Sequence, residues 1–235
     1  MAARVIAVTG ASRGIGAAIA AELLRRGFVV GSLTRKGIGI EGTLPVVCDV
    51  EDEPSLRGAF RTLAEKAGRI DGLVNNAGIH LDGKSAELQT RTFDHVMDTN
   101  ARAVFVACRE VYPHLEKNGG TIVNIGSFFD KLGVKRNLAY CASKAAVGAI
   151  TRCLAVEWAA KKIRVLNVAP GYIETELNAQ AMKGPLRPFL ESRVPAGGPG
   201  STADVAALVA ALFSESIPFL TGETIYLDGG QGMAH

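Results

Sequence analysis

The feature that most constrains the fold is an alternation of short apolar runs with longer helix-like segments along the chain. Runs such as ARVIAVT, FVVGSL, PVVCDV and GTIVNIGS contain few charges, and most are separated by segments with helical periodicity. Continuous apolar runs of this kind are what parallel strands buried on both faces require. The pattern predicts an α/β fold: one doubly wound parallel sheet of about seven strands with helices on both faces.

Two intervals break this alternation. Between FVVGSL and PVVCDV only TRKGIGIEGTL intervenes, which is glycine-rich and too short for a usual crossover helix, so we expect mostly loop there. Residues 171–200 carry four prolines between a strand and a helix, and a loop of this length is often a lid. No repeat or second domain is visible. We therefore expect one domain over residues 1–235, with a substrate lid at about 171–200.

The composition argues against several classes of protein. The formal net charge is +3 and no basic run that would follow phosphates occurs, so nucleic acid is not an expected partner. The sequence offers no membrane span, which needs about 18 uncharged apolar residues, and no signal-peptide stretch. The four cysteines form no CxxC pair and lie in apolar segments, which indicates buried thiols in a reducing compartment. We expect a cytoplasmic protein without a metal.

The stretch TGASRGIG follows the first apolar run and opens a helix-like segment. Its glycines, Gly10, Gly14 and Gly16, permit a tight turn, close approach of the backbone to a pyrophosphate, and an exposed helix N-terminus. The same spacing also occurs as ordinary turn chemistry. Its place between a strand and a helix favours nucleotide binding.

With this loop the chain resembles the short-chain dehydrogenase/reductase family, whose glycine pattern is TGxxxGxG. Further family motifs follow in order: NNAG at 75–78, Asn100 in DTNARAVF, IGS ending at Ser127, and YCASK at 140–144. PG at 170–171 with Thr175 adds another. The resemblance covers nearly the whole chain and is closest to 3-oxoacyl-acyl-carrier-protein reductases. It implies a Rossmann-like fold that binds a nicotinamide dinucleotide.

The resemblance also implies a set of cofactor-binding residues. These are Gly10, Ser12, Arg13, Gly14, Ile15, Gly16, Thr34, Arg35, Asp49, Val50, Asn76, Ala77, Gly78, Tyr140, Lys144, Pro170, Gly171, Ile173 and Thr175, with Asn75 beside them. Members that prefer NAD usually carry an acidic residue at the end of the second strand. Here Thr34, Arg35 and Lys36 follow that strand, so no carboxylate is available. Arg13 and Arg35 are either ordinary surface charges or partners of a 2′-phosphate, and we expect NADP(H).

Tyr140 and Lys144 lie one helical turn apart, so both side chains leave the same helix face. A free phenol has a pKa of about 10, and we expect the lysine ammonium and an oxidised nicotinamide to lower it. The resemblance implies that Ser127 holds the substrate carbonyl oxygen and that Asn100 distorts its helix and holds a water leading to Lys144. The expected catalytic residues are therefore Asn100, Ser127, Tyr140 and Lys144.

One departure from the family concerns the strand IRVLNV. The family often has asparagine directly after IRV, whereas this chain has Leu166 there and Asn167 one residue later. Because the period of a strand is two, we expect the amide of Asn167 to point to the opposite face of the sheet.

The segment FFDKLGVKRNLA precedes Tyr140 and bears on the substrate. Phe128 and Phe129 either line an apolar pocket or belong to the core. Lys131, Lys135 and Arg136 either receive an acidic carrier protein or form an ordinary solvated loop. The leading function is NADPH-dependent reduction of a 3-oxoacyl thioester, with an acyl carrier protein as a further partner. The alternatives are a carbonyl reductase or secondary-alcohol dehydrogenase acting on a small free molecule, and a non-catalytic NADP(H)-sensing protein.

Segments 91–117 and 139–160 carry apolar residues around more than one helix face. A helix that is apolar all round needs a cover on its outer side. We therefore expect a homo-oligomer, either a tetramer, which is usual in the family, or a dimer.

Overall fold

The computed structural model describes residues 3–176 and 178–233. Its main sheet has seven parallel strands in the order β3-β2-β1-β4-β5-β6-β9. These are β1 (Val5–Thr9), β2 (Val29–Thr34), β3 (Leu44–Val47), β4 (Gly72–Asn75), β5 (Gly120–Ile125), β6 (Ile163–Pro170) and β9 (Thr224–Leu227). The predicted seven-stranded, doubly wound parallel sheet is confirmed.

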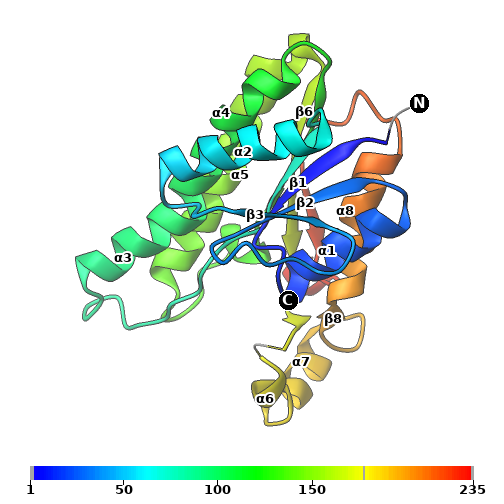
Figure 1. Ribbon diagram of the computed structural model, residues 1–235. Coiled ribbons are helices and arrows are strands. Elements are labelled where there is room, and N and C mark those ends of the chain that lie inside the picture. The colour runs from blue at the N-terminus through cyan, green and yellow to red at the C-terminus, as the bar shows by residue number, and fades with distance from the viewer. Residues whose placement is uncertain (1–2, 177, 234–235) are drawn as a thin grey trace.

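Helices cover both faces of this sheet (Figure 1). The helices on one face are α1 (Gly14–Arg25) and α8 (Thr202–Ser214), and those on the other are α2 (Glu53–Ala67), α4 (Ala103–Leu115) and α5 (Leu138–Trp158). Each face has its own buried apolar cluster, the first containing Leu23 and Phe213 and the second Phe60 and Leu115. Because both faces are packed, the strands are apolar at nearly every position, which is the pattern in the sequence.

The strand order indicates where a ligand is expected to bind. The connection from β2 to β3 is a loop, as expected, and the Thr34 hydroxyl closes its turn by bonding to both the N–H and the carbonyl of Ile38 at 2.9 Å. From β3 the chain crosses back through α2 to β4, on the other side of β1. The order in which strands are added to the sheet therefore reverses between β1 and β4. At such a reversal, open α/β sheets bind ligands at the carboxyl ends of the strands.

The segment expected as one long helix is interrupted once. It consists of α3 (Thr90–Met97), a π-helical turn η1 (Asp98–Arg102) and then α4. Asn100 lies in the middle of the π-helical turn and is fully buried. Such turns are rare and often mark functional sites.

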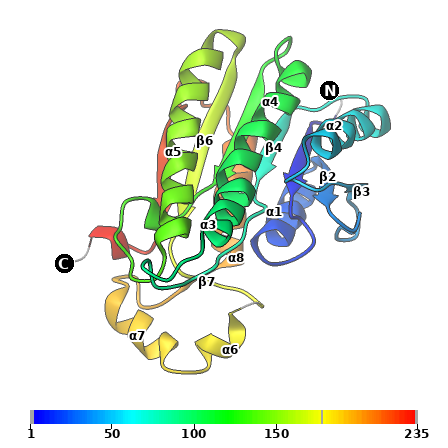
Figure 2. The ribbon, with the colours of Figure 1, turned by 90° about the vertical axis from the view of Figure 1, so that its left-hand side faces the viewer.

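Residues 171–200 form more structure than the expected loop. They contain β7 (Ile173–Glu174), α6 (Ala179–Met182) and α7 (Leu186–Arg193), and end at β8 (Gly200–Ser201), which pairs with β7 in a second small sheet. Met182, Leu190 and Val194 form a small core of their own there. Leu177 falls outside the described residues. The segment extends past the ends of the main strands (Figure 2), and its role as a substrate lid stays a prediction.

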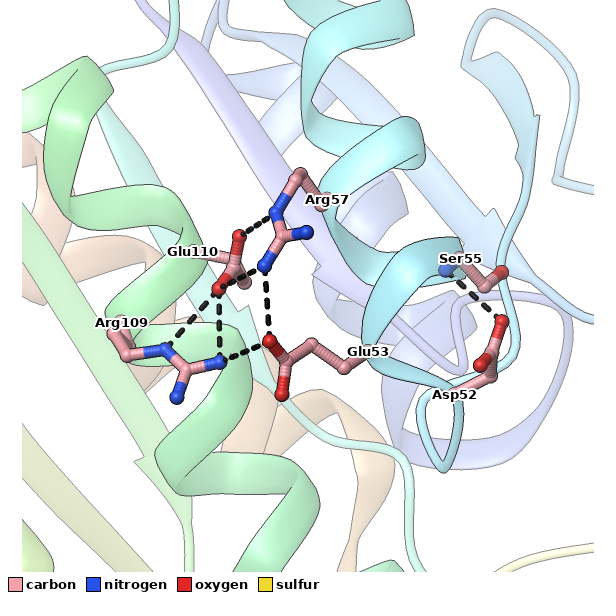
Figure 3. A network of polar contacts seen from close by, with 6 residues as sticks. All are labelled: Asp52, Glu53, Ser55, Arg57, Arg109 and Glu110. Atoms are coloured by element: carbon pink, nitrogen blue, oxygen red, sulfur yellow. Dashed lines mark hydrogen bonds and ion pairs between the residues drawn. The ribbon is translucent and has the colours of Figure 1, made fainter.

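A charged cluster at the protein surface joins α2 to α4 (Figure 3). Arg57 donates to Glu110 at 2.8 Å and to Glu53 at 2.9 Å, and Arg109 lies 2.7 Å from Glu53 and 3.0 Å from Glu110. Nearby, the side chain of Asp52 caps the start of α2 by accepting from the N–H of Ser55 at 3.0 Å. Ion pairs at a protein surface contribute at most about 1 kcal/mol each to stability.

The cysteines only partly match expectation. Cys48 and Cys108 are buried, but Cys141 is half-buried and Cys153 is exposed. The prediction of four buried thiols is wrong for Cys153, because its position on α5 faces away from the sheet. Within residues 3–176 and 178–233, no three potential metal ligands gather, and no helix there is long and apolar enough to cross a membrane. The short 3₁₀ helices are η2 (Phe128–Asp130), η3 (Ala159–Lys161) and η4 (Gln231–Met233).

Candidate active site

The loop between β1 and α1 has the conformation that the glycine pattern predicts. Gly10 and Gly14 have φ angles of +66° and +54°, which other residues rarely adopt. A side chain at Gly16 would place its Cβ 2.3 Å from the carbonyl oxygen of Gly10, so the helix starts directly against the loop. These glycines are therefore required by the backbone.

The same loop fits a pyrophosphate group. The side chain of Arg13, the residue that precedes α1, makes no capping hydrogen bond to the helix. Apart from its chain neighbours and the backbone of its own helix, no described atom lies within 4 Å of the position that a Cβ at Gly14 would occupy. An uncapped N-terminus with open space beside it presents backbone N–H groups and a partial positive charge to an anion. Ser12 and Arg13 are exposed next to it, and Ile15 is half-buried in the first turn.

The end of β4 is fixed to this loop. The side-chain amide of Asn76 donates to the carbonyls of Thr9 at 3.0 Å and Gly10 at 3.2 Å, and the backbone N–H groups of Asn76 and Ala77 donate to the Thr9 hydroxyl at 3.0 and 3.1 Å. The amide of Asn76 thus shapes the binding loop. Gly78 follows as an exposed residue, whereas Asn75 points into the core.

The end of β2 carries positive charge and no carboxylate. Thr34 is buried with its hydroxyl engaged in the turn, and Arg35 directly after it is exposed. Neither Arg13 nor Arg35 forms an ion pair within the part of the chain that the structure describes. Asp49 and Val50 are half-buried at the end of β3, where Asp49 accepts from the N–H of Glu51 at 3.1 Å.

The four predicted catalytic residues come from three parts of the chain. Tyr140 and Lys144 share a face of α5, and the Lys144 Nζ atom lies 5.6 Å from the centroid of the Tyr140 ring. Ser127 lies two residues after the end of β5, and its side chain is close enough to the Tyr140 phenol to lower the pKa of that group. Asn100 is brought to the same place by the π-helical turn.

Asn100 acts as a brace in this arrangement. Its side-chain oxygen accepts from the N–H of Ile79 at 2.8 Å, and its amide donates to the carbonyl of Ile79 at 2.8 Å and to the Ser143 hydroxyl at 3.1 Å. That hydroxyl donates to the Tyr140 carbonyl at 2.8 Å. Asn100 is therefore connected to the turn of α5 that carries Tyr140. Sequence reasoning missed Ser143, whose only signal is its position three residues after Tyr140.

Burial dominates the electrostatics of the pair on α5. Lys144 is 6 % exposed, and its Nζ donates to the Ile125 carbonyl at 2.8 Å. Burial lowers the pKa of Lys144 to about 8. Burial also raises the pKa of Tyr140, while the hydrogen bond with Ser127 acts in the opposite direction.

The expectation that Lys144 and an oxidised nicotinamide together lower the pKa of Tyr140 concerns the protein with its cofactor bound, and it stays a prediction. The protein's own groups shift this pKa upwards, because desolvation of the phenolate outweighs the hydrogen bond.

His80 is a second residue that the sequence analysis missed. Its ring centroid lies 4.7 Å from that of Tyr140, edge to face, and its Nε2 contacts the Asn137 side chain at the start of α5. His80 lies two positions after the end of the NNAG motif, and this position was the only signal in the sequence.

The PG turn after β6 is anchored on both sides. The N–H of Gly171 donates to the Leu227 carbonyl of β9 at 2.9 Å, and Pro170 and Ile173 are buried. The N–H of Thr175 donates to the Asn178 side chain at 2.8 Å. The first turn of the predicted lid is thus held at the end of the sheet beside the other strand ends.

A buried row of polar side chains runs across the sheet under α5. Asn75, Asn124 and Asn167 are in register on β4, β5 and β6. Asn75 donates to Asn124 at 2.9 Å, Asn124 donates to the Thr151 hydroxyl at 2.9 Å, and Asn167 donates to a hydroxyl of β9 at 3.2 Å. Leu166 packs on the opposite face, so the predicted reversal at positions 166 and 167 is confirmed.

Known proteins share this sequence and architecture. The family model described as enoyl-(acyl carrier protein) reductase matches residues 10–231. The chain is 34 % identical to the 3-oxoacyl-[acyl-carrier-protein] reductase of Vibrio harveyi, covering 98 % of each chain. It is 37 % identical to the 2-(R)-hydroxypropyl-CoM dehydrogenase of Xanthobacter autotrophicus, covering 96 % of this chain and 97 % of that one. A solved structure of a Serratia marcescens short-chain dehydrogenase/reductase superposes with a TM-score of 0.90 at 31 % identity, covering 98 % of each chain.

Proposed function

This chain belongs to the short-chain dehydrogenase/reductase family, and on that premise we propose that it is an NADP(H)-dependent reductase of ketones, with 3-oxoacyl thioesters as the leading substrate class. The observation that carries the proposal is the convergence of Ser127, Tyr140 and Lys144 beside the end of β5. A protein that only sensed the cofactor would not need this group, which argues against the non-catalytic alternative.

Each residue has a chemical role in the proposed reaction. A bound nicotinamide supplies hydride to the carbonyl carbon. The Ser127 hydroxyl donates a hydrogen bond to the carbonyl oxygen and stabilises its developing negative charge. The Tyr140 hydroxyl donates the proton that completes the alcohol. The Lys144 ammonium, close to the Tyr140 ring, favours the phenolate that remains, and Asn100 holds the turn of α5 in place.

The preference for NADP(H) is supported by charge at the end of β2. Arg35 and Arg13 are exposed there and at the glycine loop, without ion-pair partners in the described residues, and the strand ends in Thr34 rather than an acidic residue. Guanidinium groups bind a phosphate dianion through charge-assisted hydrogen bonds. A ribose without the 2′-phosphate would leave the guanidinium groups of Arg13 and Arg35 without an anionic partner.

Docking of a carrier protein has weaker support than the loop sequence suggested. The Lys131 Nζ atom lies 3.6 Å from the centroid of the Tyr226 ring, and Arg136 donates to Asp82 at 2.9 Å. Of the three cations considered for this role, two are thus engaged within the chain, and Lys135 is exposed. A second candidate function is therefore reduction of a small free ketone, or oxidation of its alcohol. The similarity to a 2-(R)-hydroxypropyl-CoM dehydrogenase favours it.

A substrate screen tests the proposal. Oxidation of NADPH and of NADH is followed in parallel with acetoacetyl-CoA, an acetoacetyl carrier protein and a panel of free ketones. We expect turnover with NADPH and the thioesters. Turnover of free ketones alone would favour the second candidate, and tight NADPH binding without any turnover would favour the sensor.

We further propose that the chain assembles in the cytoplasm as a homo-oligomer through α4 and α5. Phe105 on α4 is 42 % exposed and Val156 on α5 is 81 % exposed, so both helices present apolar side chains outwards. Sedimentation as a monomer at micromolar concentration would contradict the assembly.

A further inference from the structure

Three aromatic rings lie together beside Tyr140: those of Phe128, Phe129 and Tyr172, here named the aromatic wall. The centroids of the Phe128 and Phe129 rings are 4.8 Å apart, and the Tyr172 ring lies 5.6 Å from the first and 6.1 Å from the second. Phe128 and Phe129 belong to η2, whereas Tyr172 comes from the start of the predicted lid. Residues far apart in the sequence therefore build one apolar surface.

The wall is adjacent to both hydroxyl groups that would hold a carbonyl. The Phe129 ring meets the Tyr140 ring edge to face, with centroids 6.0 Å apart. The backbone N–H of the same phenylalanine donates to the Ser127 hydroxyl at 3.3 Å. A ketone oxygen held between Ser127 and Tyr140 would therefore lie close to the ring of Phe129.

The rings have little freedom to move aside. Phe128 is 3 % exposed and Phe129 is 8 % exposed, so both are already packed on protein. η2 is tied to β9, because the Tyr226 hydroxyl donates to both carboxylate oxygens of Asp130 at 3.0 and 3.1 Å. On the other side, Tyr172 packs against the small core of the lid segment. Admitting a bulky group here would require several packed side chains to shift, which is costly in a close-packed interior.

We propose that the aromatic wall limits the size of the substituent on the reacting carbonyl. The protein then reduces acetoacetyl thioesters and compact ketones and discriminates against 3-oxoacyl thioesters with long acyl chains. This inference rests on the proposed function. Its chemistry is steric and apolar: a substituent that extends from the carbonyl towards these rings meets packed side chains, so a methyl or another short group is accommodated more easily than a long chain.

Chain-length selectivity in the purified protein tests the wall. NADPH-dependent kcat/KM is measured with acetoacetyl-CoA and with 3-oxododecanoyl-CoA for the unmodified protein, Phe129→Ala, Tyr172→Ala and the control Phe219→Ala. Phe219 is fully exposed and distant in sequence from η2 and the lid. Because each methylene in a restrictive pocket changes kcat/KM by about tenfold or more, we expect the short substrate to be preferred at least tenfold. Phe129→Ala and Tyr172→Ala should raise kcat/KM for the long substrate. Phe219→Ala should retain the preference for the short substrate.

The possible outcomes separate the wall from the proposed function. Equal kcat/KM for both substrates in the unmodified protein would overturn the size limit and leave the reductase assignment intact. Absence of turnover with either thioester or any free ketone would reject the proposed function, and the inference with it. If Phe129→Ala does not fold, as judged by thermal unfolding, Tyr172→Ala decides, because Tyr172 is half-exposed and lies outside the main core. Unchanged chain-length selectivity in a folded Tyr172→Ala protein would then contradict the proposal that the aromatic wall limits substituent size.

Discussion

The Nζ atom of Lys144 lies 5.6 Å from the centroid of the Tyr140 ring, one helical turn further along α5. Because this amine donates to the carbonyl of Ile125 at 2.8 Å, the helix and β5 together determine where the charge sits. The lysine thus acts on the tyrosine through space. It does so from a buried position that lowers the pKa of its own amine to about 8.

Removing the Tyr140 hydroxyl should abolish the chemistry while sparing the fold. A positioned general acid contributes about 10²–10⁴-fold to rate, so we expect Tyr140→Phe to lower NADPH-dependent turnover at least about 100-fold. The phenyl ring keeps its contacts with His80 and Phe129, so thermal unfolding and NADPH binding should change little. Tyr112→Phe, on α4, is the matched control and should stay active. Survival of activity in Tyr140→Phe would show that the proposed mechanism is wrong.

The rate of reduction should fall as the pH rises through the pKa of Lys144. Burial lowers this pKa to about 8, so the ammonium is present below that pH and is lost above it. We expect kcat/KM to decrease on the alkaline side of that value, because kcat/KM reports groups of the free enzyme. Arginine remains charged throughout, so residual activity of Lys144→Arg should lack this decrease. A flat wild-type profile across that range would contradict the assignment.

The same pKa predicts a change in stability. Between about 8 and the usual 10.5, the unfolded chain binds a proton at Lys144 that the native protein does not. Raising the pH through this window removes that proton from the unfolded state, so native stability increases relative to Lys144→Met. Urea unfolding of both proteins at several pH values in this window measures the difference.

Replacing Arg35 with aspartate should shift the preference towards NADH. A hydrogen bond to a charged group is worth about tenfold to 100-fold in affinity, and the new carboxylate both repels a 2′-phosphate and accepts from a ribose hydroxyl. We expect the ratio of kcat/KM for NADPH over NADH to fall at least about tenfold. Arg61→Asp, an exposed change on α2, should leave the ratio unchanged. An unaltered ratio in Arg35→Asp would remove the basis for the NADP(H) preference.

Truncating Asn124 should destabilise the protein through the buried polar row. Asn124→Ala removes one hydrogen bond from the amide of Asn75 and one from the hydroxyl of Thr151, both at 2.9 Å, although Asn75 keeps its bond to the Cys108 sulfur and Thr151 its bond to the Val147 carbonyl. A buried hydrogen bond contributes about 0.5–1.5 kcal/mol, so we expect the loss of two to lower the free energy of unfolding by about 1–3 kcal/mol. Chemical denaturation measures it, with the exposed Asn118→Ala as control. A loss no larger than that of the control would show that the row is not structurally important.

Neutralising Glu110 should produce a pH-dependent loss of stability. Hydrogen bonds from Arg57 and then Arg109 lower the pKa of the Glu110 carboxyl from its usual 4.5. A carboxyl with a lowered native pKa stabilises the fold above 4.5, and that contribution is lost as the pH falls through the native pKa. Glu110→Gln should therefore be less stable than the unmodified protein at neutral pH and converge with it in acid. Glu65→Gln, whose nearest cation is 3.9 Å away, is the control. A difference that persists in acid would mean that the charge is not responsible.

The sheet could be predicted because the signal for it is local. Strands such as β1 and β5 are buried on both faces, so burial dictates an apolar residue at almost every position. The loop crossover after β2 could likewise be predicted from its length and glycines. The two helices of residues 171–200 could not, because prolines and glycines mask periodicity in segments of four and eight residues.

The sequence by itself determined which residues are candidates for the chemistry. The glycine loop, Ser127 and the spacing of Tyr140 and Lys144 are properties of order along the chain, and the structure brings them to one end of the sheet. Only the tertiary structure decided how they are tuned and what surrounds them. The pKa directions of Tyr140 and Lys144 depend on burial, and the wall of Phe128, Phe129 and Tyr172 depends on elements more than forty positions apart. Desolvation and ring packing are set by distances in space, which no pattern along the chain encodes.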